Sequence, residues 1–212
     1  EAMGSNRITV SIYSWMYDED GNDISKDYFP DLYDYCNGMK EYVMGITPTG
    51  YCNATVSYGT KSTANMQYEW DEKGNVTGDM PPSLYYGSDQ YAACNNLTIA
   101  KGRDLALLDI EKYKQVCVMG SQAAKTFFGS ANPVNQTVQV NGQNFLVVGV
   151  YASRLSEESA GASTLDNFIV FPYTARRVLG GEKPTEFLVK ARSSEDMTEA
   201  ISRLSGFLRG LV

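Results

Sequence analysis

Residues 100–150 decide the fold, with AKGRDLALLDIEKYKQVCVMGSQAAKTFFG over residues 100–129 and QTVQVNGQNFLVVGV over residues 136–150. The first run predicts a Gly-Arg turn, a buried strand over Val116–Met119 and a short helix that ends at Gly129, because glycine tolerates the left-handed conformation of a helix cap. In the second run, Asn141-Gly142 separates two alternating apolar segments. This pattern predicts a hairpin, because a type I′ turn needs positive φ at both central residues.

The order of these motifs resembles the extracytoplasmic core domain of MacB-type ABC transporter permeases. In that family a Gly-Arg turn and an aspartate precede a strand, a helix ending in Phe-Gly and a hairpin ending in Val-Val-Gly-Val. Further residues that match are Val118, Phe128, Val138, Phe145, Val147 and Val150. The resemblance implies structural roles for Gly102, Arg103, Asp109, Gly120, Gly129, Gly142, Gly149 and Pro172.

Two strand-helix segments lie near the ends of the chain. Alternating apolar residues predict a strand over Arg7–Tyr17, helical spacing predicts a helix over Asp27–Met44, and Tyr51–Tyr58 is expected to be the next strand. Strand, helix and strand in this order form a split βαβ unit with a right-handed crossover. Toward the other end, Glu186–Lys190 predicts a strand and Ser193–Leu211 a helix, whose expected buried residues are Met197, Ile201, Leu204, Leu208 and Leu211.

The expected fold is therefore α+β. The resemblance implies that residues 6–60 and 183–212 form one discontinuous, porter-like βαβ-type base layer next to the membrane, and that residues 61–182 form an inserted, β-rich distal subdomain. It also implies that both chain ends leave the base layer close together. Residues 1–5 are expected to be a cloning remnant, since Met3-Gly4-Ser5 is typical of one.

Composition excludes several classes of function. The chain has 212 residues, of which 43% are hydrophobic, and its 18 basic and 25 acidic side chains give a net charge of −7. This balance argues against nucleic acid or an anionic membrane surface as a partner. No apolar run approaches the roughly 20 residues of a membrane-spanning helix.

Catalytic and cofactor-binding patterns are also missing from the sequence. The chain has no histidine, which excludes Ser-His-Asp and Cys-His nucleophiles, and it has no Walker A motif. Neither an enzyme nor a bound cofactor or metal is therefore expected. The acidic turn Asp18–Asp23 lacks calcium-loop spacing, because its glycine stands at the fourth position. The sequence leaves open whether the four cysteines form disulfides.

Two kinds of surface contact are considered. Arg103 could bind an anion, although a local pair with Asp104 or Asp109 is preferred, since it lies between a glycine turn and a strand. The candidate contact residues are Tyr85 and Tyr86 and, in the polar loop 152–162, Ser156, Glu157 and Glu158. Tyrosine faces bind glycans or proteins, but they also serve as packing. A hairpin is expected over Asn65–Thr77, with Tyr68 and Trp70 on a half-exposed strand.

Two functional hypotheses follow. In the first, which the resemblance implies, the chain is the extracytoplasmic domain of an ABC transporter permease at the cell membrane. Its partners would be the permease's own membrane helices, a cytoplasmic ATP-binding subunit, and a protein, peptide or lipoprotein substrate, but no nucleic acid. In the second, it is a free-standing secreted or lipid-anchored domain that binds a glycan or protein through tyrosines. The sequence does not identify a transported substrate.

Overall fold

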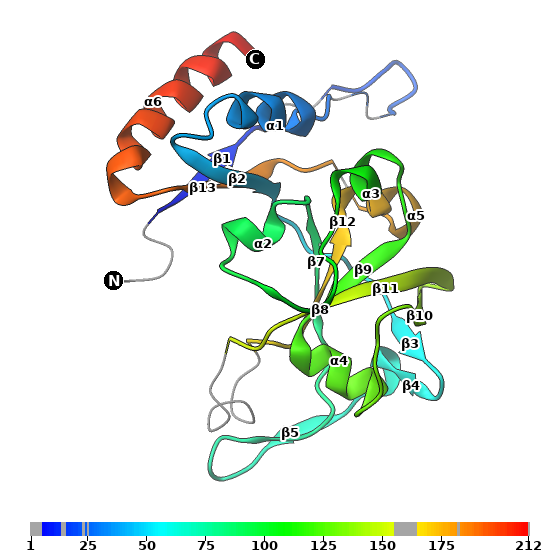
Figure 1. Ribbon diagram of the computed structural model, residues 1–212. Coiled ribbons are helices and arrows are strands. Elements are labelled where there is room, and N and C mark those ends of the chain that lie inside the picture. The colour runs from blue at the N-terminus through cyan, green and yellow to red at the C-terminus, as the bar shows by residue number, and fades with distance from the viewer. Residues whose placement is uncertain are drawn as a thin grey trace. The chain divides into compact units, whose positions relative to one another are not determined.

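The computed structural model describes residues 6–13, 16–22, 24, 26–154, 165–181 and 183–211. Within these ranges the chain divides into two compact units (Figure 1). Unit 1 combines the chain up to Gly50, residues Gln90–Asn96 and the chain from residue 182 on; unit 2 consists of Tyr51–Asp89 and Leu97–Gly181. The fold is α+β, as predicted.

Unit 1 is built on a three-stranded sheet in the order β1-β13-β2. Strand β13 is antiparallel to both neighbours, and it lies between the two strands that α1 connects. The described elements of unit 1 are β1 (Arg7–Ser11), α1 (Phe29–Asn37), β2 (Val43–Pro48), α2 (Tyr91–Cys94), β13 (Glu186–Ala191) and α6 (Ser194–Leu211).

Helices cover both faces of this sheet. On one face Phe187 of β13 stacks on Phe29 of α1, with ring centroids 6.1 Å apart. On the other face Gly45 of β2 adjoins α2, where an added Cβ would lie 3.0 Å from Cβ of Gln90. Figure 1 shows α1 and α6 together on the first face and α2 on the second. The sheet is therefore covered on both sides, which explains why every residue of β13 from Phe187 to Ala191 is buried.

Three predicted boundaries in unit 1 were wrong. Helix α1 ends at Asn37 rather than Met44, because Gly38 caps it by donating to the carbonyls of Asp34 and Tyr35. Residues Val43–Pro48, rich in β-branched side chains, form the strand that was expected over Tyr51–Tyr58. Of that predicted strand, Val56–Tyr58 forms a strand that pairs with β10 (Thr137–Val140) of unit 2, and Tyr51 makes only an isolated bridge with Tyr85. Strand β1 already ends at Ser11.

Helix α6 begins where its sequence signal predicted. The Ser193 hydroxyl accepts the N–H of Asp196 at 3.2 Å and donates to the Asp196 carboxylate at 2.9 Å. The predicted buried stripe is confirmed at Leu204 and wrong at Ile201, which is 45% exposed; Ala200, which was not predicted, is also buried.

The described chain ends of unit 1 are not close together, contrary to expectation. The carbonyl of Asn6 accepts the N–H of Ala191, three residues before α6 begins. Helix α6 has 18 residues, so Leu211 at its end lies about 27 Å along the helix axis from its first residue, Ser194. The length of α6 therefore separates the two ends.

Unit 2 is built on an eight-stranded mixed sheet in the order β4-β3-β10-β11-β9-β12-β7, with β8 pairing on β11. Strands β9 and β11, and β7 and β12, run parallel to each other. Its described elements are β3 (Val56–Tyr58), β4 (Lys61–Ser62), η1 (Thr63–Asn65), β5 (Tyr68–Trp70), β6 (Val76–Gly78), β7 (Ser83–Gly87), β8 (Ile99–Gly102), α3 (Leu107–Glu111), β9 (Val116–Met119), α4 (Ser121–Phe128), β10 (Thr137–Val140), β11 (Gln143–Tyr151), β12 (Phe168–Pro172), η2 (Tyr173–Ala175) and α5 (Arg176–Leu179).

The predicted hairpin and helix of unit 2 are confirmed. Strands β10 and β11 pair across Asn141 and Gly142, whose φ angles are 49° and 79°. Strand β9 is buried along its whole length, and α4 ends at Gly129. Phe145 and Phe171 meet edge to face in the core, with centroids 5.3 Å apart. The stretch that decides the fold therefore supplies the centre of this sheet.

Strands β5 and β6 form a separate two-stranded sheet, as the sequence predicted for this segment. Their turn has the sequence Asp-Glu-Lys-Gly-Asn, and the same pattern with Asp in place of Lys occurs at residues 18–22 of unit 1. In both turns an oxygen of the first aspartate accepts two backbone N–H groups. These carboxylates therefore hold turns, which accounts for the acidic segment at residues 18–22.

None of the helices in the described part of the chain has the length and apolar character that crossing a bilayer requires. The four cysteines are buried free thiols. Burial raises the pKa of Cys36, Cys94 and Cys117 to about 12. These thiols therefore stay protonated and unreactive at neutral pH.

Candidate contact site and the Gly-Arg turn

The Gly-Arg turn is a closed polar cluster. The Arg103 guanidinium donates to both carboxylate oxygens of Asp109, at 2.8 and 3.2 Å. One of these oxygens also accepts the N–H of Ala106 at 2.8 Å, at the start of α3. The Asp109 side chain is 1% exposed and that of Arg103 is 48% exposed. Arg103 is thus engaged by Asp109, the local pair that the sequence favoured over an anion site.

The two aspartates of this turn differ in pKa. Burial disfavours the charged form of Asp109, but hydrogen bonds from Arg103 and Ala106 outweigh burial and lower the pKa of its carboxyl. Burial raises the pKa of Asp104 despite the hydroxyl of Tyr151, which donates to its carboxylate at 2.8 Å. Because Tyr151 is 1% exposed, this pair faces the core rather than a substrate.

Close backbone approach explains the glycine of this turn and a glycine on the neighbouring strand. Gly102 of β8 pairs with Gly149 of β11. A Cβ added to Gly149 would lie 2.0 Å from the Arg103 carbonyl oxygen, and one added to Gly102 would lie 2.2 Å from that of Val148. A side chain at either position would push the two strands apart. The remaining structural-motif residues lie in the same unit: Gly120 begins α4, Gly129 ends it, Gly142 forms the hairpin turn and Pro172 ends β12.

The predicted tyrosine contact is only partly at the surface. Tyr86 is 8% exposed and its hydroxyl donates to the carbonyl of Gly180 at 2.9 Å, so it is a core residue and the prediction of a contact there was wrong. Tyr85 is half-buried and packs against Tyr51, with ring centroids 5.2 Å apart. Tyr51 itself is 76% exposed. Ser156, Glu157 and Glu158 lie outside the described residues.

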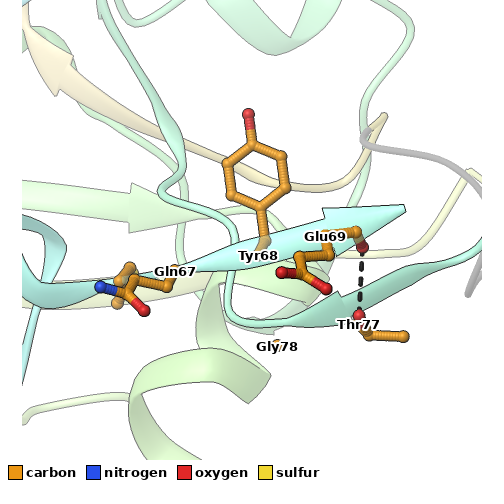
Figure 2. A pocket seen from close by; sticks show the side chains of 6 residues that line it. Gln67, Tyr68, Glu69, Thr77 and Gly78 are labelled. Atoms are coloured by element: carbon orange, nitrogen blue, oxygen red, sulfur yellow. Dashed lines mark hydrogen bonds between the residues drawn. The ribbon is translucent and has the colours of Figure 1, made fainter. Parts of the chain in front are cut away.

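The β5–β6 hairpin carries an exposed aromatic surface that was not among the predicted contact residues. Figure 2 shows Tyr68 pointing away from β5 on one side and Glu69 on the other, where the hydroxyl of Thr77 donates to the Glu69 carbonyl at 3.2 Å. Tyr68 is 44% exposed and Trp70 is 53% exposed. The sequence signal was the aromatic alternation Tyr-Glu-Trp, but exposure on both faces could not be inferred from it. The hollow at this hairpin is lined by Met66, Gln67, Tyr68, Glu69, Thr77 and Gly78.

The described part of the chain contains no group of three or more histidine, cysteine, aspartate or glutamate side chains placed to hold a metal ion. The arrangement offers surfaces for contact, and its perturbed carboxylates are tied into a turn. Fold and site thus define a class: an α+β domain of two units, in which unit 2 has glycines at close backbone contacts and an exposed aromatic hairpin.

Comparison with known proteins identifies the family. A family model described as the MacB-like periplasmic core domain matches residues 1–207. The chain belongs to this family. It is 24% identical over 175 residues to the macrolide export ATP-binding/permease protein MacB of Aggregatibacter actinomycetemcomitans, which covers 81% of this chain and 24% of that protein. It is 29% identical over 160 residues to the pyoverdine export ATP-binding/permease protein PvdT of Pseudomonas aeruginosa, covering 74% of this chain and 21% of that protein.

Solved structures show the same fold. The periplasmic region of MacB from Actinobacillus actinomycetemcomitans superposes with a TM-score of 0.63 at 21% identity, over 98% of this chain and 85% of that one. The extracellular domain of the ABC-type transporter YknZ from Gram-positive bacteria gives a TM-score of 0.54 at 16% identity, over 91% and 88%. The chain spans about a quarter of the length of the first two curated relatives.

Proposed function

We propose that this chain is the extracytoplasmic domain of an ABC transporter permease and that it couples cytoplasmic ATP hydrolysis to efflux, export or sensing. The observation that carries the proposal is the family match over residues 1–207, together with relatives that are named as export and permease proteins. Family membership speaks against the alternative of a free-standing glycan- or protein-binding domain.

The domain itself takes no chemical step in this proposal. Its side chains hold shape and offer contacts, while a separate cytoplasmic ATP-binding subunit or domain hydrolyses the nucleotide. Unit 1 adjoins the membrane helices of the permease, and unit 2 carries the surface that meets a protein or peptide outside the membrane. The support within unit 1 is its sheet, in which a strand from each end of the chain lies side by side.

Two measurements test this proposal. Calorimetric titration of the chain with ATP and Mg²⁺ should give no binding heat, because the sequence has no phosphate-binding loop. In the intact transporter, replacement of residues 7–211 by a flexible Gly-Ser linker should abolish export while the cytoplasmic subunit still hydrolyses ATP. Unchanged export by the linker variant would refute the coupling role.

A further inference from the structure

The β5–β6 hairpin has unused strand edges. Among the described residues, β5 and β6 pair only with each other, so each strand keeps one edge outside any ladder. No residue from Met66 to Asp79 is buried. Exposed edges of this kind are templates for an added strand, and proteins usually protect them. A two-stranded hairpin is also only marginally stable by itself, so a third strand supplied by a partner would stabilise it.

One face of the hairpin is aromatic. Because side chains alternate along a strand, Tyr68 and Trp70 share a face, and their partners on β6 are Gly78 and Val76. Gly78 has no side chain to cover the ring of Tyr68. The rings are therefore presented to solvent, where they offer the flat, electron-rich surfaces that attract lysine and arginine.

The same segment is acidic. Residues 66–79 contain four acidic side chains and one basic side chain, which gives a net charge of −3. Asp79 is paired with Lys61 at 2.7 Å, and Asp71 accepts N–H groups of its own turn. Within the described ranges, Glu69 and Glu72 form no ion pair. Their carboxylates are left to interact with an incoming cation.

We propose that the hairpin Met66–Asp79 binds an extended, lysine- or arginine-bearing segment of a partner protein. The segment adds a strand to a free edge of the hairpin, which supplies main-chain hydrogen bonds, and a cationic side chain lies on the ring of Trp70. Glu69 and Glu72 select for positive charge. This inference deepens the proposed function and rests on it, because it names the chemistry of the extracytoplasmic partner.

Tryptophan fluorescence tests the binding mode directly. The chain has two tryptophans, so the substitution Trp15→Phe leaves Trp70 as the single reporter. The probe is an acetylated eight-residue peptide of alternating arginine and valine. One control peptide has a central valine replaced by proline, which interrupts strand pairing, and another has glutamate in place of every arginine. We expect a saturable change in Trp70 emission with the first peptide and at least tenfold weaker binding of both controls.

Variants of the protein locate the site. Glu69→Lys combined with Glu72→Lys should weaken binding of the arginine peptide at least tenfold, as should Tyr68→Ala. The matched control Tyr51→Ala removes another exposed aromatic ring and should leave binding unchanged. Circular dichroism of each variant confirms that it is folded. Equal binding of the proline peptide, or binding that ignores the charge reversal, would overturn the inference.

Self-association is a separate outcome of the same test. If sedimentation shows that the chain dimerises and that Trp70→Ala abolishes the dimer, the occupant is a second copy and the proposed partner is wrong. If the arginine peptide fails to bind while the linker variant of the intact transporter still loses export, the hairpin assignment fails and the proposed function stands.

Discussion

The Gly-Arg turn and the β5–β6 hairpin use the same chemistry in opposite ways. In both, an aspartate accepts backbone N–H groups and holds a turn. In the first, Asp109 is 1% exposed and is bound by Arg103, so the polar groups satisfy one another. In the second, no residue is buried, and within the described ranges Glu69 and Glu72 form no ion pair. Polar residues that are paired internally maintain shape, whereas those left unpaired beside aromatic rings are available to a partner.

The largest expected effect is at the close approach of β8 and β11. Gly149→Ala would place a Cβ 2.0 Å from a backbone carbonyl oxygen, which cannot move away as a flexible side chain would. We expect a loss of about 3 kcal/mol in the free energy of unfolding, measured with urea. The control Gly210→Ala adds a methyl group in open space on α6 and should not destabilise the domain. Equal free energies of unfolding for both variants would show that the close approach of β8 and β11 can accommodate a side chain.

Removing the charge of Asp109 should have the next largest effect. Asp109→Asn loses the ion pair with Arg103 but keeps the shape of the side chain. Because the carboxylate is buried and Arg103 is half exposed, we expect a loss of about 2 kcal/mol in urea unfolding. Asp79→Asn removes an exposed pair with Lys61 and should cost less than about 0.5 kcal/mol. A larger loss from the Asp79 change would reverse the comparison.

The contributions of Asp104 and Asp109 to the free energy of unfolding should depend on pH in opposite directions. The folded-state pKa of Asp109 is lowered, so its stabilisation is present above its ordinary pKa of 3.8 and is lost as pH falls through the lower, folded-state value. The folded-state pKa of Asp104 is raised, so its contribution is present below 3.8 and is lost as pH rises through the raised value.

Unfolding titrations between pH 3 and pH 7 measure this difference. The stability gap between the wild type and Asp109→Asn should narrow at low pH. As pH falls over the same range, the free energy of unfolding of the wild type should rise relative to that of Asp104→Asn. Parallel curves for both variants would contradict the assignment.

The smallest stability effect is expected on the hairpin. Trp70→Ala removes a ring that is 53% exposed, so the free energy of unfolding should change by no more than about 0.5 kcal/mol. A loss above about 2 kcal/mol, seen in the same urea experiment, would mean that Trp70 is a packing residue and not a contact.

Local signals predicted much of the fold. Gly129 after a helical run and Asn141-Gly142 between alternating apolar segments encode their structures within a few residues, and both lie where expected. Strand β2 was missed because helical spacing continues into Val43 and Met44, and only pairing with β13 makes this segment extended. Tertiary pairing therefore overrode a local pattern.

The candidate site was harder to predict. The ion pair of Arg103 with Asp109 joins residues six positions apart, so the sequence could suggest it. The burial of Tyr86 depends on Gly180, which is 94 residues away, and no local pattern contains that information. Tyr68 and Trp70 are visible as an aromatic alternation, but only the structure shows that they are 44% and 53% exposed.

The central claim is that unit 2 makes a contact that couples transport to ATP hydrolysis. The most direct test measures both rates in the same proteoliposomes, with the intact transporter carrying Tyr68→Ala and Trp70→Ala, and with Tyr51→Ala as the control. The account predicts that the double variant hydrolyses ATP at a near normal rate while its transport falls at least tenfold, and that the control retains both rates. Normal transport by the double variant, or an equal fall in both rates, would contradict it.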